Sequence, residues 1–252
     1  MSERLVVENY RGIRVTRSLG LVVVGGAWIA TFAWSWAATA TAAAWGVLAG
    51  SVLVFAAGLV DDLAVSGPRG LRKHARAMAE GQVTTGIVKA VVAVGASVVV
   101  IALEPSRAWW VRLLGVVLVA ASTNVWNALD VRPGRALKTF VPVGIIFVLL
   151  ADVSPAPAVL GVAVAALVAL PMDLSERGML GDGGATLLGF TAGLALYLSL
   201  PGWAVVPAAL AMVGLNVVAE TTSFSRVIDD VAALRWLDRL GRRAGSSAGK
   251  RI

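Results

Sequence analysis

Apolar residues gather in eight long runs along this chain, with short polar segments between them. The runs lie near residues 19–37, 41–60, 86–103, 109–126, 138–152, 156–173, 185–200 and 203–221. A helix needs about 20 mostly apolar residues to cross the hydrocarbon core of a bilayer. The pattern therefore predicts an all-α, polytopic membrane protein with about eight transmembrane helices.

The composition supports the membrane class and excludes several kinds of site. Hydrophobic residues make up 58% of the 252 positions, and the mean hydropathy is +0.81. Such a chain is too apolar for a soluble domain. It contains no cysteine, which excludes disulfides, iron–sulfur clusters and thiol nucleophiles, and its single histidine, His74, excludes a zinc site built on several imidazoles.

The charged residues orient the predicted helices in the membrane. Of the 22 Lys and Arg residues, only Arg107 and Arg112 fall at or near one side of an eight-span topology. The positive-inside rule then places both termini in the cytoplasm of a cell-membrane protein. Of the 15 acids, only Glu104 and Asp152 fall outside, so we expect a cytoplasmic active site. The net charge of +7 thus indicates topology and contact with membrane lipids, and we expect no nucleic-acid partner.

The segment 223–243 has helical periodicity of a different kind. Val227, Val231, Leu234 and Leu237 follow helical spacing between charged positions, and Gly241 is a plausible end. We predict an amphipathic helix with Ser225 as N-cap, lying on the inner membrane surface, or alternatively packed on the cytoplasmic loops. Residues 1–243 would form a single domain, and 244–252 a flexible tail.

Three acidic motifs lie at the cytoplasmic ends of the apolar runs. The first is the pair Asp61 and Asp62 at the end of the second run. Adjacent helical residues point about 100° apart, so the two carboxylates cannot form one clamp. One can face a metal or substrate and the other a structural partner, although a solvated helix end is the plainer interpretation.

The second motif places Asn124, Asn127 and Asp130 at intervals of three residues. This spacing keeps them near one face of a helix, where two amides and a carboxylate can bind a hydrated cation and a phosphate. Three cations that suit phosphate binding follow the motif: Arg132, Arg135 and Lys138. The alternative is a polar helix end followed by topology-determining charges.

The third motif is the stretch Gly181-Asp182-Gly183-Gly184 before the seventh run. Glycines let backbone amides approach a phosphate at a helix N-terminus, and a divalent metal would reconcile Asp182 with that anion. A simple turn is the alternative. A basic segment with Lys73 and His74, and Lys89 beyond it, is either a phosphate clamp or a contact with anionic lipid.

Taken together, the motifs resemble those of the polyprenyl-phosphate N-acetylhexosamine-1-phosphate transferase superfamily. The order matches: a DD pair, then NxxNxxD with a glycine loop, then GD with small residues, across about residues 8–243. The resemblance implies transfer of a sugar-1-phosphate from a nucleotide diphosphate sugar to polyprenyl phosphate. It also implies a magnesium cofactor and a role in starting cell-envelope glycan synthesis. The oligomeric state stays open, with a homodimer as one option.

The resemblance also implies residue roles. Asp61, Asp62 and Asp182 match catalytic positions, and Asn127 and Asp182 match residues linked to magnesium. Asn124 and Asp130 match the loop that lines the nucleotide pocket. Lys73 is a looser match to a phosphate-contacting lysine, and Arg132, Arg135 and Lys138 complete the expected substrate-binding set.

The chain also departs from the family pattern. Val131 replaces a glycine, Pro133 occupies a position linked to the base, and no histidine follows His74 where a His-rich motif is usual. Against the ten spans usual in the family, we also expect the chain to lack the first span and to end in the amphipathic helix in place of the last. These departures leave the sugar and nucleotide open. They also leave a second interpretation: an inactive relative that binds a lipid carrier or a partner membrane protein.

Overall fold

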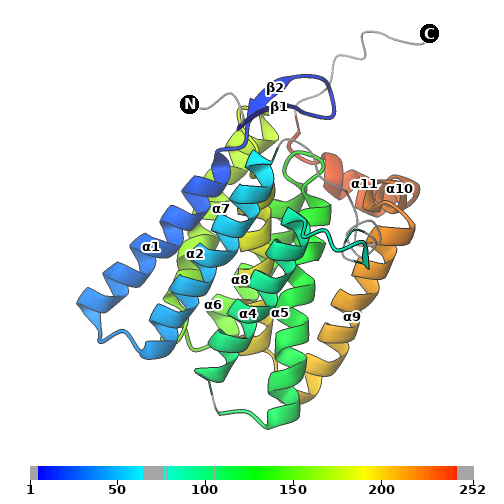
Figure 1. Cartoon of the computed structure of the whole chain (residues 1–252). Coiled ribbons are helices and arrows are strands. Elements are labelled where there is room, and N and C mark those ends of the chain that lie inside the picture. The colour runs from blue at the N-terminus through cyan, green and yellow to red at the C-terminus, as the bar shows by residue number, and fades with distance from the viewer. Residues whose placement is uncertain (1–4, 65–76, 78, 105, 243–252) are drawn as a thin grey trace, which may run out of the picture.

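The structure is a computed structural model that describes residues 5–64, 77, 79–104 and 106–242. Eight long helices run roughly alongside one another in one bundle (Figure 1). Their bounds are α1 (Leu19–Ala37), α2 (Ala42–Leu63), α4 (Thr85–Ala102), α5 (Trp109–Leu129), α6 (Arg135–Leu150), α7 (Pro157–Leu174), α8 (Gly181–Ser199) and α9 (Gly202–Thr221). Each coincides with one predicted apolar run to within a few residues, which confirms the all-α, polytopic class.

Six of these helices are long and apolar enough to cross a membrane: α1, α2, α4, α5, α7 and α9. The other two depart from a simple lipid-facing span. Helix α6 has only 16 residues. Helix α8 lies at the centre, packed against α1, α2, α5, α6 and α7, and fifteen of its nineteen residues are buried. Because α8 is surrounded by protein, its glycines and threonines do not have to face lipid.

Small residues let α8 approach its neighbours closely. A Cβ added to Gly58 of α2 would lie 2.5 Å from the backbone oxygen of Asp182. A Cβ added to Gly189 of α8 would lie 2.4 Å from the backbone oxygen of Ser122 in α5. Contacts of this kind let membrane helices pack backbone to backbone. They bring the ends of α2, α5 and α8, which carry the acidic motifs, to one place.

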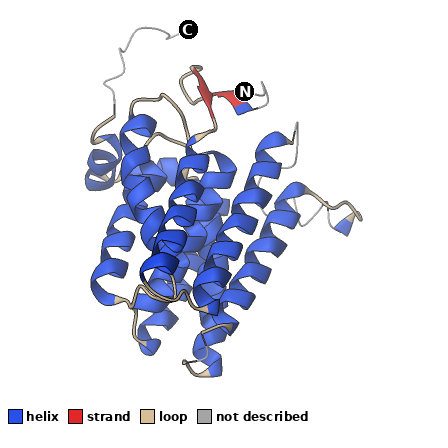
Figure 2. Ribbon diagram, turned by 90° about the vertical axis from the view of Figure 1, so that its left-hand side faces the viewer, coloured by secondary structure: helices blue, strands red, loops and turns tan. Residues whose placement is uncertain are grey.

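A short antiparallel hairpin, which the sequence analysis did not predict, precedes α1. Strand β1 (Val6–Glu8) pairs with β2 (Arg14–Thr16), with Val7 opposite Val15. The hairpin lies across the end of the bundle that also carries α10 and α11 (Figures 1 and 2). The described beginning and end of the chain therefore share one side, as an even number of crossings requires.

The C-terminal segment forms two helices, so the prediction of one helix is corrected. Helix α10 (Phe224–Asp230) and helix α11 (Ala232–Arg239) meet at Val231, which has an extended backbone. The N-cap of α10 is Ser223, whose hydroxyl accepts a hydrogen bond from the Arg226 amide, and not Ser225. Gly241 follows with a φ of +74°, which is consistent with the predicted stop.

Candidate active site

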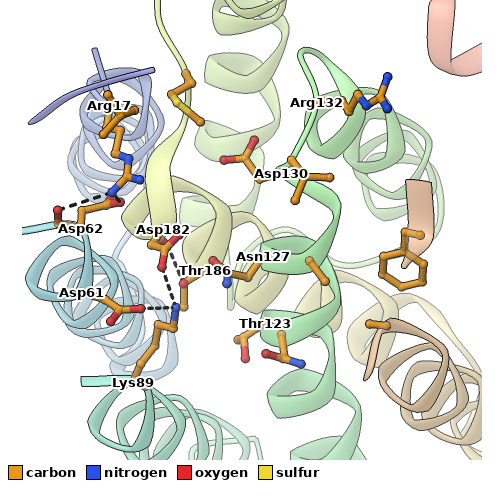
Figure 3. Close-up of a pocket in the computed structure, with 18 of the residues that line it drawn as sticks. Arg17, Asp61, Asp62, Lys89, Thr123, Asn127, Asp130, Arg132, Asp182 and Thr186 are labelled. Carbon is orange, nitrogen blue, oxygen red and sulfur yellow. Dashed lines mark hydrogen bonds and ion pairs between the residues drawn. The ribbon is translucent and has the colours of Figure 1, made fainter. Parts of the chain in front are cut away.

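The acidic motifs meet in one cavity at the end of the bundle near the hairpin. The cavity has a volume of about 1440 Å³ and is lined by residues from the hairpin, α2, α4, α5, α7, α8 and α9. Its lining includes all six residues singled out in the three motifs: Asp61, Asp62, Asn124, Asn127, Asp130 and Asp182. Figure 3 shows side chains from opposite walls pointing toward one another. Helices far apart in the sequence thus build a single polar chamber.

The two adjacent aspartates point to different partners, as their helical spacing predicts. Asp62 accepts hydrogen bonds from Arg17 Nη1 at 2.8 Å and from the Gly183 amide at 3.1 Å, and its side chain is 2% exposed. Asp61 accepts hydrogen bonds from Lys89 and from the Thr85 hydroxyl, and its side chain is 21% exposed. Asp62 therefore ties α2 to the segment between β2 and α1 and to α8, while Asp61 is the more exposed member of the pair.

Lys89 joins the first and third motifs. Its Nζ lies 2.8 Å from Asp61 Oδ2 and 3.0 Å from Asp182 Oδ2, so one ammonium group is shared by two carboxylates (Figure 3). The sequence analysis noted Lys89 only as part of a basic segment. The available signal was a lysine inside an apolar run, because a charge within a membrane helix usually faces a partner or a cavity. Lys73, the lysine chosen from the sequence, lies outside the described residues.

The stripe on α5 presents polar groups to the opposite wall. Asn127 points from α5 toward Asp182 and Thr186 (Figure 3). Its Oδ1 is buried and has no hydrogen-bond partner. Asn124 donates a hydrogen bond to Asn216 of α9 at 2.5 Å. An orphaned buried acceptor is costly unless a ligand satisfies it.

Carboxylates are crowded around the end of α5. Asp130, which caps α5, is partly exposed and lines the chamber; burial raises its pKa well above the ordinary value, and the charges of Asp173 and Asp182 raise it further. Asp173 lies in α7 and accepts a hydrogen bond from the Gly134 amide at 2.8 Å. Asp173 was not among the predicted site residues, although this residue ends an apolar run as the other acids do. This concentration of negative charge favours binding of a cation.

The glycines of the third motif serve the geometry of Asp62. The motif forms the first residues of α8, and Gly181 has a φ of +71°, a conformation that favours glycine. A Cβ at Gly181 would lie 2.7 Å from Asp62 Oδ2. The Gly183 amide, expected from the sequence to be open to a phosphate, donates to Asp62 instead. The motif therefore orients one carboxylate and presents a second, Asp182.

The three cations after the α5 stripe separate in space. Arg132 lines the chamber, with its guanidinium 5.1 Å from the ring centroid of Tyr10 in the hairpin loop. Arg135 points away and pairs with Asp238 of α11 at 2.9 Å. Lys138 donates to three backbone oxygens, those of residues 237, 238 and 240. Arg135 and Lys138 thus hold the C-terminal segment and do not line the chamber.

The hairpin forms a wall of the chamber and is attached by its loop. Asn9 Nδ2 and Arg11 Nη1 donate to the two carboxylate oxygens of Glu176, at 2.7 and 2.8 Å. Glu176 has a φ of +57°, which is uncommon for a non-glycine residue, and this turn aims its carboxylate at the hairpin. Asn9 and Tyr10, with Arg17 after the second strand, also line the chamber.

A metal site must be judged from the donor atoms present. Within the part of the chain that the structure describes, no group of three or more His, Cys, Asp and Glu side chains could hold a metal ion. Amide oxygens are not in that count, and the orphaned Asn127 Oδ1 is a hard oxygen donor of the type that magnesium accepts. With the Asp182 carboxylate pointing at the same space, the residues fit a magnesium ion that keeps several waters.

Comparison with known proteins adds one finding to this geometry. A family model described as "Glycosyl transferase family 4" matches residues 44–200, which is more than half of the chain. The match includes all three acidic motifs and Lys89, while the hairpin, α1 and α9 to α11 lie outside it. No curated protein and no solved structure matches.

Proposed function

Since the chain belongs to glycosyl transferase family 4, we propose that it transfers a sugar-1-phosphate from a nucleotide diphosphate sugar to a polyprenyl phosphate. The family is one of polyprenyl-phosphate hexosamine-1-phosphate transferases, and the chain is a multi-pass membrane protein. An N-acetylhexosamine is the sugar we expect. The product would start the synthesis of a cell-envelope glycan.

The observation that carries the proposal is the ammonium group of Lys89 between Asp61 and Asp182 in a large chamber at the end of the bundle. A positive charge held by two carboxylates is pre-positioned and can turn to a phosphate that enters the chamber. Arg17 is held in the same manner by Asp62. Fixed charges of this kind stabilise phosphoryl transfer because they need no reorganisation during the reaction.

The chamber also suits a lipid acceptor. Its lining continues along α4 and α9 with Ala90, Val94 and Val213, and the two valines are 46% and 42% exposed. Figure 1 shows α5 lying between α4 and α9. An apolar groove along α5, with α4 and α9 on either side, would let an isoprenoid chain stay in the bilayer while its phosphate reaches Lys89. A soluble acceptor would not need such a groove.

The proposed reaction is a direct displacement at phosphorus. An oxygen of the lipid phosphate forms a bond to the sugar-proximal phosphorus of the donor. The bond from that phosphorus to the bridging oxygen breaks, and the electron pair leaves on the nucleoside monophosphate. The second pKa of a phosphate monoester is near 6, so the acceptor is already mostly dianionic at neutral pH. Asp61 and Lys89 would therefore position the lipid phosphate rather than remove a proton from it.

Magnesium is part of the proposal. Asp182 and Asn127 would hold the ion, which when bound neutralises the charge of the donor diphosphate. Asn127 has an acceptor oxygen without a hydrogen-bond partner, and Lys89 orients the Asp182 carboxylate. Arg132, on the rim near Tyr10, would contact the donor. The chamber would face the cytoplasm of a cell membrane, as the distribution of basic residues predicts.

The test is a transfer assay with purified protein in nanodiscs. Undecaprenyl phosphate and a panel of nucleotide diphosphate sugars are supplied with and without magnesium, and the lipid product is identified by mass spectrometry. Asp182→Asn should abolish transfer. The matched control is Asp152→Asn, which removes an exposed carboxylate between α6 and α7, at the opposite end of the bundle from the chamber. Absence of transfer across the panel contradicts the proposal and favours the inactive, lipid-binding interpretation.

A further inference from the structure

Asn216 is a polar residue in an otherwise apolar stretch of α9, and it lies beyond the region matched by the family model. Only Val205 and Ala209 of this helix are buried, so α9 packs lightly against the bundle. Asn216 nevertheless lines the chamber and contacts the α5 stripe. A polar side chain at this depth in a membrane helix calls for an explanation through its partners.

The hydrogen bonds of Asn216 fix the orientation of its amide. Its Nδ2 donates to the backbone oxygens of Ala121 at 3.0 Å and Met212 at 2.8 Å. Both partners are carbonyls, which can only accept, so this end must be the NH₂ group. The Oδ1 is therefore turned toward Asn124, which must answer with its own NH₂ at 2.5 Å. Two backbone carbonyls thereby determine which way the Asn124 amide faces.

We propose that Asn216 is a positioning residue that makes Asn124 present its oxygen, and not its NH₂ group, to the substrate. The inference rests on the proposed function, because Asn124 is a substrate-binding residue only in that context. Asn127 on the same stripe also offers an oxygen, its buried Oδ1 without a partner. The wall of α5 would then be a row of acceptors, suited to hydroxyl or N–H donors of the nucleotide sugar or to the waters of a hydrated cation.

Substitution of Asn216 distinguishes an effect on the orientation of the Asn124 amide from an effect on helix packing. Without Asn216, nothing in these contacts selects one orientation of the Asn124 amide over the other, and half of its population would present a donor to the same ligand group. Asn216→Leu keeps the size of the side chain in a membrane setting where leucine is well tolerated. We expect kcat/KM for the nucleotide sugar to fall about 2-fold, because only half of the Asn124 population keeps the competent orientation. The matched control is Thr221→Val, which removes a polar group from α9 that bonds only within its own helix.

The decisive experiment adds Asn124→Asp. A carboxylate presents oxygen whichever way it turns, but next to the Asn216 oxygen it meets a second acceptor. We therefore expect Asn124→Asp alone to be impaired, and the double variant with Asn216→Leu to be more active than Asn124→Asp alone. The inference is overturned if the activity losses of the two single variants multiply in the double variant. It is also overturned if Asn216→Leu is as active as Thr221→Val.

Failure of the proposed function gives a different result. In that case the unaltered protein shows no transfer with any donor, and thermal unfolding in detergent tests whether Asn124 and Asn216 interact. Asn216→Leu and Asn124→Leu should then lower the melting temperature non-additively, because each removes the same contact. Additive shifts would show that the two amides do not act on one another and would overturn the inference.

Discussion

The buried ion pair between Arg135 of α6 and Asp238 of α11 should hold the C-terminal segment against the bundle. The two side chains are only 4% and 5% exposed, and Asp238 accepts two hydrogen bonds from Arg135, at 2.9 and 3.3 Å. It also accepts one from Arg242 at 2.6 Å. We expect Asp238→Asn to undock the segment, because it leaves the Arg135 charge buried without its anion.

The magnitude follows from the burial of the pair. Removing one partner of a buried ion pair costs about 3–5 kcal/mol. At about 1.4 kcal/mol for each factor of ten, the lower figure corresponds to an opening equilibrium about 100-fold larger. Since α10 and α11 are short helices at the edge of the fold, the change should appear as local opening and not as global unfolding.

Hydrogen–deuterium exchange of peptides from residues 224–242 measures this opening. Asp238→Asn should accelerate exchange there about 100-fold and leave the peptides of α8 unchanged. Asp229→Asn is the matched control: Asp229 is 44% exposed and lies 3.8 Å from Arg132, so its loss should alter exchange less than about 5-fold. Equal, small effects of the two substitutions would refute the reasoning that burial gives the Arg135 pair its strength.

Four further predictions address the chamber and its supports. Lys89→Met should lower the rate of transfer at least about 100-fold, because two carboxylates lose their shared cation. Lys89→Arg should be intermediate in the same assay. An undiminished rate in Lys89→Met would show that Lys89 takes no part in the mechanism. Asn127→Ala should raise the magnesium concentration for half-maximal activity about 10-fold, and an unchanged titration would exclude it as a ligand. Gly58→Ala should lower the free energy of unfolding by about 1–3 kcal/mol and the melting temperature by several degrees, because the new methyl group meets a backbone oxygen of α8 at 2.5 Å. A methyl group at Gly95 has nothing within 4 Å, so Gly95→Ala should leave the melting temperature unchanged. Burial alone would raise the pKa of Asp238, but hydrogen bonding and the charges of its arginine partners lower that pKa overall. Docking of α11 should therefore be complete above the ordinary aspartate pKa of about 3.9 and should weaken as the pH falls below that value. Hydrogen–deuterium exchange of α11 measures this change.

The structure changes how the predicted amphipathic segment is understood. The sequence predicts a helix that lies on the membrane surface or packs on the cytoplasmic loops. In the structure Arg242 donates to the Pro133 oxygen and to Asp238, so the segment packs on the bundle. Leu234, Trp236 and Leu237 remain 41–63% exposed, so an apolar face is still available to the membrane surface. The segment therefore docks on the bundle and leaves an apolar face exposed.

The sequence by itself determined the class of the fold and the identity of the acids at the helix ends. Apolar runs of spanning length leave the chain few options in a bilayer, because every backbone group must be bonded within its own helix. The helical period also predicted that Asp61 and Asp62 would face different partners, since neighbouring residues on a helix diverge by about 100°. These features depend only on local spacing.

Tertiary structure alone decided which distant groups meet. Lys89 lies 28 residues from Asp61 and 93 from Asp182, and Asn216 lies 92 residues from Asn124. No local period links such positions; Lys89 meets Asp61 because α4 packs on α2, and Asn216 meets Asn124 because α9 packs on α5. Tertiary packing also directs Arg135 and Lys138 to the C-terminal segment, although in sequence they follow the α5 stripe as closely as Arg132 does. Charge and spacing in the sequence identify a residue as a candidate for the site. The packing of the helices decides whether the side chain of that residue reaches the site.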